Sequence, residues 1–573
     1  MLHSISTCFP NYSTINCAAF GVAALVGWRL YTTLSNWRRK KRLYAAIAQR
    51  QHERERRIDQ IEARLNSDSD EEKAIRKRIQ SLTLEQLIAA LQSGTYTAVQ
   101  SVRAWQEKAI EAHRRTNAVT LFIAEAEDWA RQLDSAARQP DYQKPALFGV
   151  PFSLKESNNL KGYEHTRGYA QMLGHLSQTD AVIVTVLRDH LGAIPIALTN
   201  VPQSLLSFSC SNPVYGTTTN PHNPARTCGG SSGGEAALVA AGGILFGIGG
   251  DVGGSIRMPC HFSGICGIKP CAHRLSKVGG QPSIPGRPMI CSALGPMAPD
   301  VQTIVTVMRQ LLSVDGPMYD LDPYTAPIPF NQSVFESQSP LTIGYYEDNQ
   351  FITATTACRR AVQEAKRALE QAGHTLLPWR STADAGQYLL NMLNKDIVDP
   401  NFAEFTRLMR LPTRLRTLLA RLLGQKRLAA MASRQPITVS DLRQVYADIG
   451  TYRAEFVQKW KRAGLDAVIC PAQVSPALPH DLPMKVPGTT SYTAIYNLLD
   501  CPAGVVPVST VTEEDQKAMR QHPVTDRHDR LVRQANIDGT VGLPVGVQCV
   551  ALPFREEIVL RLMADVEKNL TNG

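Results

Sequence analysis

Two glycine-rich stretches carry the serines that could do chemistry in this chain. The first, residues 229–234, contains Ser231 and Ser232, and the second leads directly into Ser255. Glycine backbone is free in φ and lets a ligand approach closely, and successive N–H groups around glycine can form a concavity that binds anions. Such a concavity suits a phosphate group or the oxyanion of a tetrahedral intermediate. The pattern favours either nucleotide binding or acyl transfer by serine.

The known nucleotide-binding motifs do not fit these stretches. A phosphate-binding loop needs Lys and then Ser or Thr after its last glycine, whereas Gly234 is followed by Glu235. The dinucleotide-binding fingerprint is broken because Val252 takes the place of its last glycine. The G-x-S-x-G turn of α/β-hydrolases is also absent, since Arg257 closes the motif around Ser255.

A serine hydroxyl needs a neighbouring base to take its proton. Lys155 is the candidate, because residues 149–156 form an apolar run with this ionisable group near its end. His222 and His261 flank the glycine-rich region, but the sequence assigns no Asp partner to either. The residues alone leave Lys155 open between a catalytic base and a solvated charge at the end of a strand.

Residues 229–234 and 247–259 match the amidase signature at every defined position, and on these residues the chain resembles the amidase signature family. The resemblance implies a Ser-Ser-Lys triad. In it Ser255 attacks the carbonyl carbon, Ser231 relays the proton, and a neutral Lys155 accepts it and later returns it to the leaving amine. The resemblance implies no metal and no other cofactor.

The same resemblance implies the remaining site residues. The oxyanion and substrate-binding groups are Leu205, Ser231 and the backbone N–H groups of Val252, Gly253, Gly254 and Ser255. Ser232 and Asp251 are expected to orient the catalytic groups. Leu205 stands where the family has a methionine, and Gly250 stands where it has a threonine, which leaves the role of that hydroxyl open.

Residues 200–208, 501–508 and 542–548 are similar to the fatty-acid amide hydrolases within this family. That similarity implies hydrolysis of N-acylethanolamines and primary fatty amides through an acyl-enzyme, by a membrane-bound homodimer whose partners are the lipid amide and membrane lipids. Two alternatives remain: a soluble-type amidase, such as a glutaminase subunit or a peptide amidase, and an inactive membrane-tethered scaffold. The intact triad weighs against the scaffold.

Composition limits the compartment and the partners. The net charge of the 573-residue chain is +10, but much of the excess lies between Arg38 and Arg57, so no nucleic-acid partner is expected. The twelve cysteines are scattered, without a C-x-x-C pair. They predict free thiols in a reducing compartment rather than a disulfide framework or a zinc site.

The N-terminal region predicts a membrane anchor. Residues 15–34 are expected to form a transmembrane signal anchor, with residues 1–14 as a short non-cytosolic N-terminus. A cleaved signal peptide is disfavoured because residues 1–20 contain no Lys or Arg. The basic residues after the apolar run predict that the catalytic domain lies on the cytosolic side of the membrane. We expect an intracellular membrane of the endoplasmic-reticulum type, although the sequence does not specify the organelle. Residues 35–80 predict a charged helical linker, either lying along anionic headgroups or solvated.

The catalytic domain is predicted over residues 81–573, opening with a capping box from Thr83 to Gln86. Strand-like apolar runs such as 193–198 alternate with helical patterns such as those that begin at Cys358 and at Phe554, and this alternation predicts an α/β domain around a largely parallel sheet. The family resemblance implies the amidase-signature fold, in which a large twisted, mixed sheet is flanked by helices. Residues 410–431 carry one leucine face with arginines around it. This pattern favours an amphipathic membrane-cap helix over a helix that packs on the core.

Overall fold

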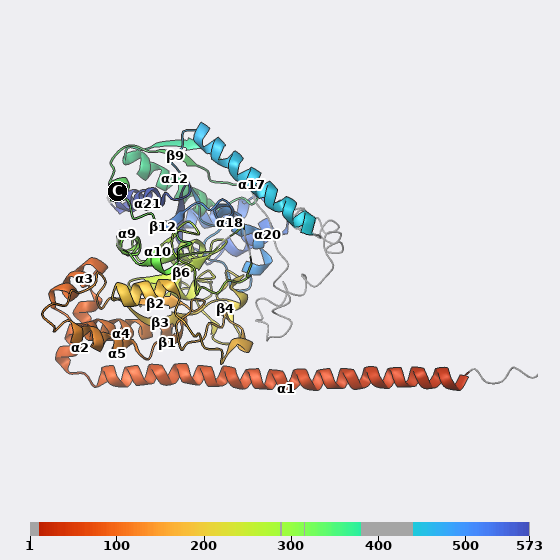
Figure 1. Cartoon of the computed structure of the whole chain (residues 1–573). Helices are drawn as coiled ribbons and strands as arrows, with labels where there is room; N and C mark the ends of the chain where they lie inside the picture. The colour runs from red at the N-terminus through yellow and green to blue at the C-terminus, as the bar shows by residue number, and fades with distance from the viewer. Residues whose placement is uncertain (1–10, 287–288, 291, 315, 380–438, 572–573) are drawn as a thin grey trace, which may run out of the picture.

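The computed structural model describes residues 11–286, 289–290, 292–314, 316–379 and 439–571, arranged around one large sheet (Figure 1). The amphipathic helix predicted over 410–431 lies outside the described residues. In sheet order, the eleven strands are β1 (Val119–Phe122), β3 (Ile194–Thr199), β2 (Pro151–Lys155), β6 (Gly247–Asp251), β8 (Ala293–Ala298), β7 (Cys266–Lys269), β12 (Ala503–Thr510), β13 (Pro544–Ala551), β11 (Ala467–Pro471), β9 (Thr342–Tyr345) and β10 (Thr375–Pro378).

The sheet is mixed, as predicted, but it is not largely parallel. Of its ten pairings, four are parallel and six are antiparallel. Strand order explains the difference, because β8 inserts between β6 and β7 and runs antiparallel to both, and β12 and β13 add further antiparallel pairings with each other and with β7 and β11. Helix and strand periodicity identifies the elements but carries no information on which strands become neighbours.

Several elements lie where periodicity predicted them. The run at 193–198 becomes β3, and its residues are all buried. The Ala-rich pattern from Cys358 becomes α12 (Thr356–Gln371), and the run from Phe554 becomes α21 (Glu556–Thr571). Both helices pack against β12 and β13, so the hydrophobic core lies between these helices and the sheet.

The other helices flank the sheet or extend from it. Those that precede the catalytic loops are α2 (Asp70–Gln80), α3 (Leu84–Ser93), α4 (Ala98–Thr116), α5 (Ala126–Ala136) and α6 (Val182–Thr185). Those that follow are α7 (Gly233–Ala240), α8 (Arg257–Ser263), α9 (Val301–Leu311), α10 (Met318–Leu321), α11 (Gln332–Phe335), α17 (Val439–Arg462), α18 (Ser491–Leu498), α19 (Glu513–Ala518) and α20 (Arg527–Asn536). The predicted capping box from Thr83 to Gln86 is present at the start of α3.

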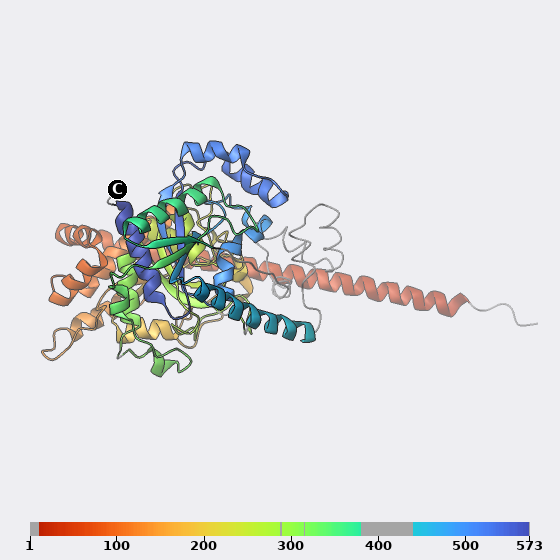
Figure 2. The same ribbon diagram turned by 90° about the horizontal axis from the view of Figure 1, so that it is seen from above.

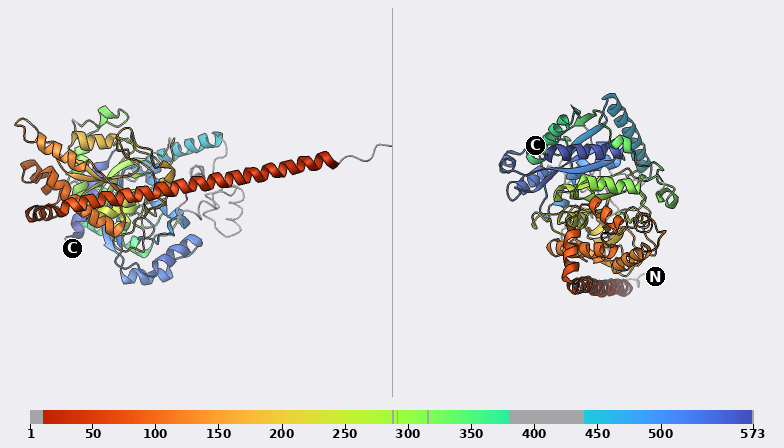
Figure 3. Two further views of the ribbon diagram at one scale, coloured as in Figure 1. Left: turned by 90° about the horizontal axis from the view of Figure 1, so that it is seen from below. Right: turned by 90° about the vertical axis from the view of Figure 1, so that its left-hand side faces the viewer.

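The N-terminal region is one continuous helix, α1 (Asn11–Asn66), which runs past the catalytic body (Figures 1, 2 and 3). Its C-terminal part docks on the body and buries Ile47, Ile58, Ile61 and Leu65. The core therefore includes part of the segment that was predicted to be a linker. A set of large apolar side chains is exposed farther toward its N-terminal end: Leu25, Val26, Trp28, Leu30, Tyr31, Leu34 and Trp37.

The membrane span predicted over residues 15–34 is not supported. In the part of the chain that the structure describes, no helix is both long enough and apolar enough to cross a bilayer. The physical reason is the length of the apolar run, because Arg29 follows the twelve residues from Cys17 to Trp28, whereas a span needs about 20.

Nine cysteines of the described residues are free thiols, as composition predicted, and each of these nine is buried. They come from the sheet, from neighbouring helices and from the loops between them: Cys210, Cys228, Cys260, Cys266, Cys271, Cys358, Cys470, Cys501 and Cys549.

Candidate active site

Two neighbouring parallel strands bring the candidate base to the second glycine-rich stretch. β2 ends at Lys155 and β6 ends at Asp251, and the strands pair in parallel with Leu154 opposite Ile248. The carboxyl ends of parallel strands meet at the same edge of a sheet, which is where α/β proteins bind ligands. Lys155 therefore lies beside the backbone that leads to Ser255.

Lys155 is buried and bonded to the first glycine-rich stretch. Its side chain is 2% exposed, and Nζ lies 2.8 Å from Ser231 Oγ and 3.0 Å from the carbonyl oxygen of Gly250. Burial lowers the pKa of Lys155 to about 8, although the nearby Asp251 carboxylate opposes this shift. A substantial fraction of the amine is therefore neutral near physiological pH. The strand-end lysine is not solvated, which removes one of the two interpretations that the residues alone left open.

Ser232 joins the two glycine-rich stretches. Its backbone N–H donates to the carbonyl oxygen of Ser255 at 3.0 Å. Its hydroxyl donates to the Gly250 carbonyl at 3.2 Å and accepts from the Gly250 N–H at 3.1 Å. Because the Gly250 carbonyl also accepts from Lys155, Ser232 holds the backbone that positions the amine.

The structure brings Ser231 and Ser255 into one site without a hydrogen bond between their hydroxyls. Within the described residues, the Ser231 hydroxyl bonds to Lys155, and Ser255 is bonded through its carbonyl oxygen. Catalytic hydrogen bonds often tighten only when substrate is bound. The Lys155–Ser231 half of the predicted relay is thus formed, and the Ser231–Ser255 half is open.

Asp251 organises the turn that precedes Ser255. Its carboxylate accepts from the backbone N–H groups of Gly254 at 2.8 Å and Ile256 at 3.0 Å, and from the side chains of Arg257 and Asn497. Burial alone would raise the pKa of Asp251, but the Arg257 guanidinium and these hydrogen bonds outweigh it and hold the pKa well below its usual range. Asp251 is therefore a charged, fully paired anchor for the loop.

The four backbone N–H groups predicted for the oxyanion hole are not equivalent. The Gly254 N–H already donates to Asp251, so it is not free to bind an oxyanion. Among the described residues, no hydrogen-bond acceptor is found for the N–H groups of Val252, Gly253 or Ser255. These three residues are also partly exposed, whereas Gly254 is buried. Three of the four predicted N–H donors are thus available to bind an oxyanion at this edge of the sheet.

Leu205 ends a short 3-10 helix (Gln203–Leu205), and the loop after it packs against the first glycine-rich stretch. Both Ser204 and Leu205 have positive φ, 70° and 62°, which is uncommon for residues with a side chain. The loop continues to Ser207, whose carbonyl oxygen lies so close to Gly230 that a Cβ there would approach it to 2.6 Å. The Leu205 loop therefore abuts the backbone next to Ser231.

Gly250, which replaces a threonine of the family, has room for a side chain. A Cβ there would lie 3.4 Å from the side chain of Leu294 and 3.8 Å from Lys155 Nζ, which are ordinary contact distances. Packing around a Cβ therefore does not exclude a side chain at this position, and in this chain the Lys155 amine donates to the Gly250 carbonyl.

Sequence reasoning missed several buried polar groups that support the site. Arg257 is fully buried and also bonds Gln548 and the Thr493 carbonyl. Glu235, on α7, accepts from the hydroxyls of Ser153 on β2 and Thr199 on β3. Arg257 and Glu235 lie within the glycine-rich region and could have been found there. Thr493 lies 240 residues from its partner Gly253, and no local signal marks it.

Burial raises the pKa of Glu235 to about 7, although the two hydroxyl donors lower it in part. Thr199 is also the residue of β3 that stands opposite Lys155 of β2. Glu235 therefore ties the helix after Ser231 to the two strands that hold the base.

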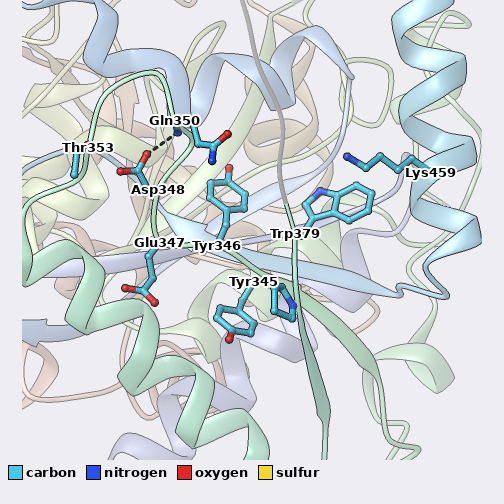
Figure 4. A pocket seen from close by; sticks show the side chains of 9 residues that line it. Tyr345, Tyr346, Glu347, Asp348, Gln350, Thr353, Trp379 and Lys459 are labelled. Carbon is cyan, nitrogen blue, oxygen red and sulfur yellow. Dashed lines mark hydrogen bonds between the residues drawn. The ribbon is translucent and has the colours of Figure 1, made fainter. Parts of the chain in front are cut away.

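A separate cavity of about 690 Å³ lies at the end of β9 (Figure 4). Its lining mixes aromatic and charged side chains and contains none of the predicted site residues: Tyr345, Tyr346, Glu347, Asp348, Gln350, Thr353, Pro378, Trp379 and Lys459. Tyr346 packs on Tyr492 of α18, and their ring centroids are 6.2 Å apart. The same helix carries Thr493, so α18 links this cavity to the loop before Ser255.

Comparison with known proteins identifies the family. The profile described as Amidase matches residues 100–560, which include the buried Lys155–Ser231 pair and both glycine-rich stretches. This chain belongs to the amidase family. It is an amidase-signature hydrolase, as the residues around Ser255 predicted.

The similarity to individual amidases covers nearly the whole chain. A Caenorhabditis elegans protein named fatty acid amide hydrolase 1 is 44% identical over 94% of this chain and 97% of its own length. A Sus scrofa protein named fatty-acid amide hydrolase 1 is 39% identical over 98% of this chain and 97% of its own length. A solved structure of a fatty acid amide hydrolase has a TM-score of 0.69 and 23% identity, covering 90% of this chain and 88% of that chain. This structural likeness shows the amidase fold.

Proposed function

We propose that this amidase hydrolyses fatty-acid amides, namely N-acylethanolamines and primary fatty amides, with Ser255 as nucleophile. The observation that carries the proposal is the buried Lys155 amine, 2.8 Å from Ser231 Oγ at the edge of the sheet that leads to Ser255. The substrate class is supported by the relatives named fatty-acid amide hydrolase, at 44% and 39% identity over almost the entire chain.

In the proposed mechanism, Ser255 Oγ attacks the amide carbonyl carbon while its proton passes to Ser231, whose own proton passes to neutral Lys155. The N–H groups of Val252, Gly253 and Ser255 stabilise the oxyanion. The proton then returns through Ser231 to the leaving nitrogen, and the C–N bond breaks to give an acyl-enzyme. Water attacks this ester by the same relay and releases the fatty acid.

We also propose that α1 holds the enzyme at a membrane. The support is its row of exposed apolar side chains, which includes Trp28, Leu34 and Trp37, followed by the basic residues 38–42. Such a helix can bind a lipid surface through its apolar side chains and its positive charge. The buried free thiols fit a reducing compartment, in agreement with a cytosolic catalytic body at an intracellular membrane. The homodimer stays a prediction from the family resemblance.

Activity-based labelling with a fluorophosphonate, followed by hydrolysis assays, tests the function. We expect covalent labelling at Ser255, turnover of oleamide and little turnover of glutamine. A protein that is labelled and hydrolyses glutamine but not oleamide would belong to the soluble-type amidases. A protein that shows neither labelling nor turnover would be the inactive scaffold.

A further inference from the structure

The peptide group between Gly253 and Gly254 is held at both ends by side chains. Its carbonyl oxygen accepts a hydrogen bond of 2.7 Å from Thr493 Oγ1, and its N–H donates to Asp251 Oδ1 at 2.8 Å. A peptide group is planar, so two bonds on opposite edges fix its rotation about the chain axis. This peptide lies between the free N–H groups of Gly253 and Ser255.

The orientation of this peptide controls the direction of the N–H groups on either side of it, those of Gly253 and Ser255. Rotation of the Gly253–Gly254 peptide changes ψ of Gly253 and φ of Gly254, and glycine resists neither change. Gly254 has φ +121°, and a Cβ at this position would collide with the Thr493 side chain. Gly253 and Gly254 therefore have no side chains that could hold this peptide, and its orientation depends on Asp251 at the start of the turn and on groups from elsewhere in the fold.

Thr493 is well placed to supply that restraint. It is fully buried on α18, and its carbonyl oxygen accepts from Arg257 Nη1 at 3.0 Å. Arg257 also pairs with Asp251, so the two groups that hold the peptide are joined to each other. The Thr493 hydroxyl lies 3.1 Å from the Thr490 carbonyl as well, but the contact with Gly253 is the shorter one.

We propose that Thr493 is a positioning residue for the oxyanion hole, acting through the Gly253 carbonyl on the N–H groups of Gly253 and Ser255. The proposal rests on the proposed function of Ser255. It predicts that the Thr493 hydroxyl contributes to stabilising the tetrahedral intermediate and contributes little to binding of the planar substrate. If the hydroxyl only supported the fold, its loss would change the free energy of unfolding. It would not change how much better the site stabilises the tetrahedral intermediate than it binds the planar substrate.

The test compares Thr493→Val, which keeps the shape and removes the hydroxyl, with Thr493→Ser, which keeps the hydroxyl. For Thr493→Val we expect kcat for oleamide to fall about tenfold with KM unchanged, less than the 10²–10³-fold typical of losing a donor outright. Affinity for a long-chain trifluoromethyl ketone, which forms a tetrahedral adduct with serine, should fall by a similar factor. Thr493→Ser should stay near the wild type.

Thr489→Val is the matched control. Thr489 is also a buried threonine whose hydroxyl bonds a backbone carbonyl, that of Val486, and no hydrogen bond links it to the Gly253 loop. We expect this variant to keep the wild-type kcat and ketone affinity. If Thr493→Val does not fold, Thr493→Ala removes the same hydroxyl without adding bulk and should show the same loss.

Several results would overturn the inference. Unchanged kcat and ketone affinity in Thr493→Val, or equal losses in Thr493→Ser, would show that the hydroxyl does not position the loop. A rise in KM alone would make Thr493 a substrate-binding residue. A wild type that is labelled at Ser255 but does not hydrolyse fatty amides would refute the proposed substrate class, and the labelling rates of the same variants would still measure the effect of Thr493.

Discussion

Replacing Lys155 by Met tests whether this lysine is the general base. Met has a similar length and no charge, so the buried space beside Ser231 stays filled while the amine is lost. Loss of a positioned general acid–base costs about 10²–10⁴-fold in rate. We expect amide turnover to fall by this factor and turnover of the matching ester to fall less, because an alkoxide leaves with less help from an acid than an amine does.

The pH profile follows from the pKa of Lys155, which burial lowers to about 8. The neutral fraction that can accept a proton rises from about one tenth at pH 7 to about nine tenths at pH 9. The wild-type kcat/KM should therefore rise about tenfold over these two units and then level off. In Lys155→Met hydroxide must replace the base, so kcat/KM should rise about 100-fold over the same range without levelling.

The assay measures kcat/KM for an oleoyl amide and the matching methyl ester from pH 6 to 10. Thermal unfolding provides the control. Because the pKa of Lys155 is lower in the folded protein than in the unfolded chain, the protonated lysine costs stability below about pH 8, and that cost disappears as pH rises toward about 10.5. The Met variant should be at least as stable as the wild type at pH 7. Equal losses for amide and ester with an unchanged pH profile would remove Lys155 from the mechanism.

Three further outcomes follow from the site and from α1. Ser255→Ala should abolish fluorophosphonate labelling without changing the unfolding temperature, and surviving labelling would place the nucleophile elsewhere. Arg257→Met leaves the buried Asp251 carboxylate without its partner, so denaturant unfolding should show a free energy of unfolding lower by about 3–5 kcal/mol. A stability equal to that of the wild type would mean that the ion pair does not anchor the loop. Deleting residues 1–34 removes exposed apolar side chains but not the docked part of α1, so hydrolysis should persist while flotation with liposomes falls. Flotation equal to that of the full chain would contradict a membrane role for α1.

Local signals predicted the elements and the glycine-rich loops. β3 and α12 follow from short-range periodicity and from the glycines beside them, Gly192 before β3 and Gly373 after α12, and these signals do not depend on distant residues. The direction of the strands depends on which strands become neighbours. The position of β8 between β6 and β7 is a long-range property that no window of the sequence contains.

The same distinction applies to the site. Lys155, Ser231 and Ser255 could be identified because each lies in a motif, whereas Thr493 acts on Gly253 across 240 residues. The N–H of Gly254 was predicted to bind the oxyanion, and only the structure reveals that Asp251 occupies it. For α1, the change from apolar to charged composition was interpreted as an element boundary near residue 34, although helical backbone continues through such a change.

The nine cysteines whose burial the structure describes give this protein a built-in reporter of local unfolding. A buried thiol cannot react with an alkylating reagent until the structure around it opens, so each alkylation rate measures how often its region becomes accessible. Cys228 precedes the first glycine-rich stretch, Cys260 lies on the helix after Ser255, and Cys549 lies in the middle of the sheet. Timed alkylation followed by peptide mass mapping would therefore distinguish loosening of the catalytic loops from unfolding of the whole sheet, without any engineered label.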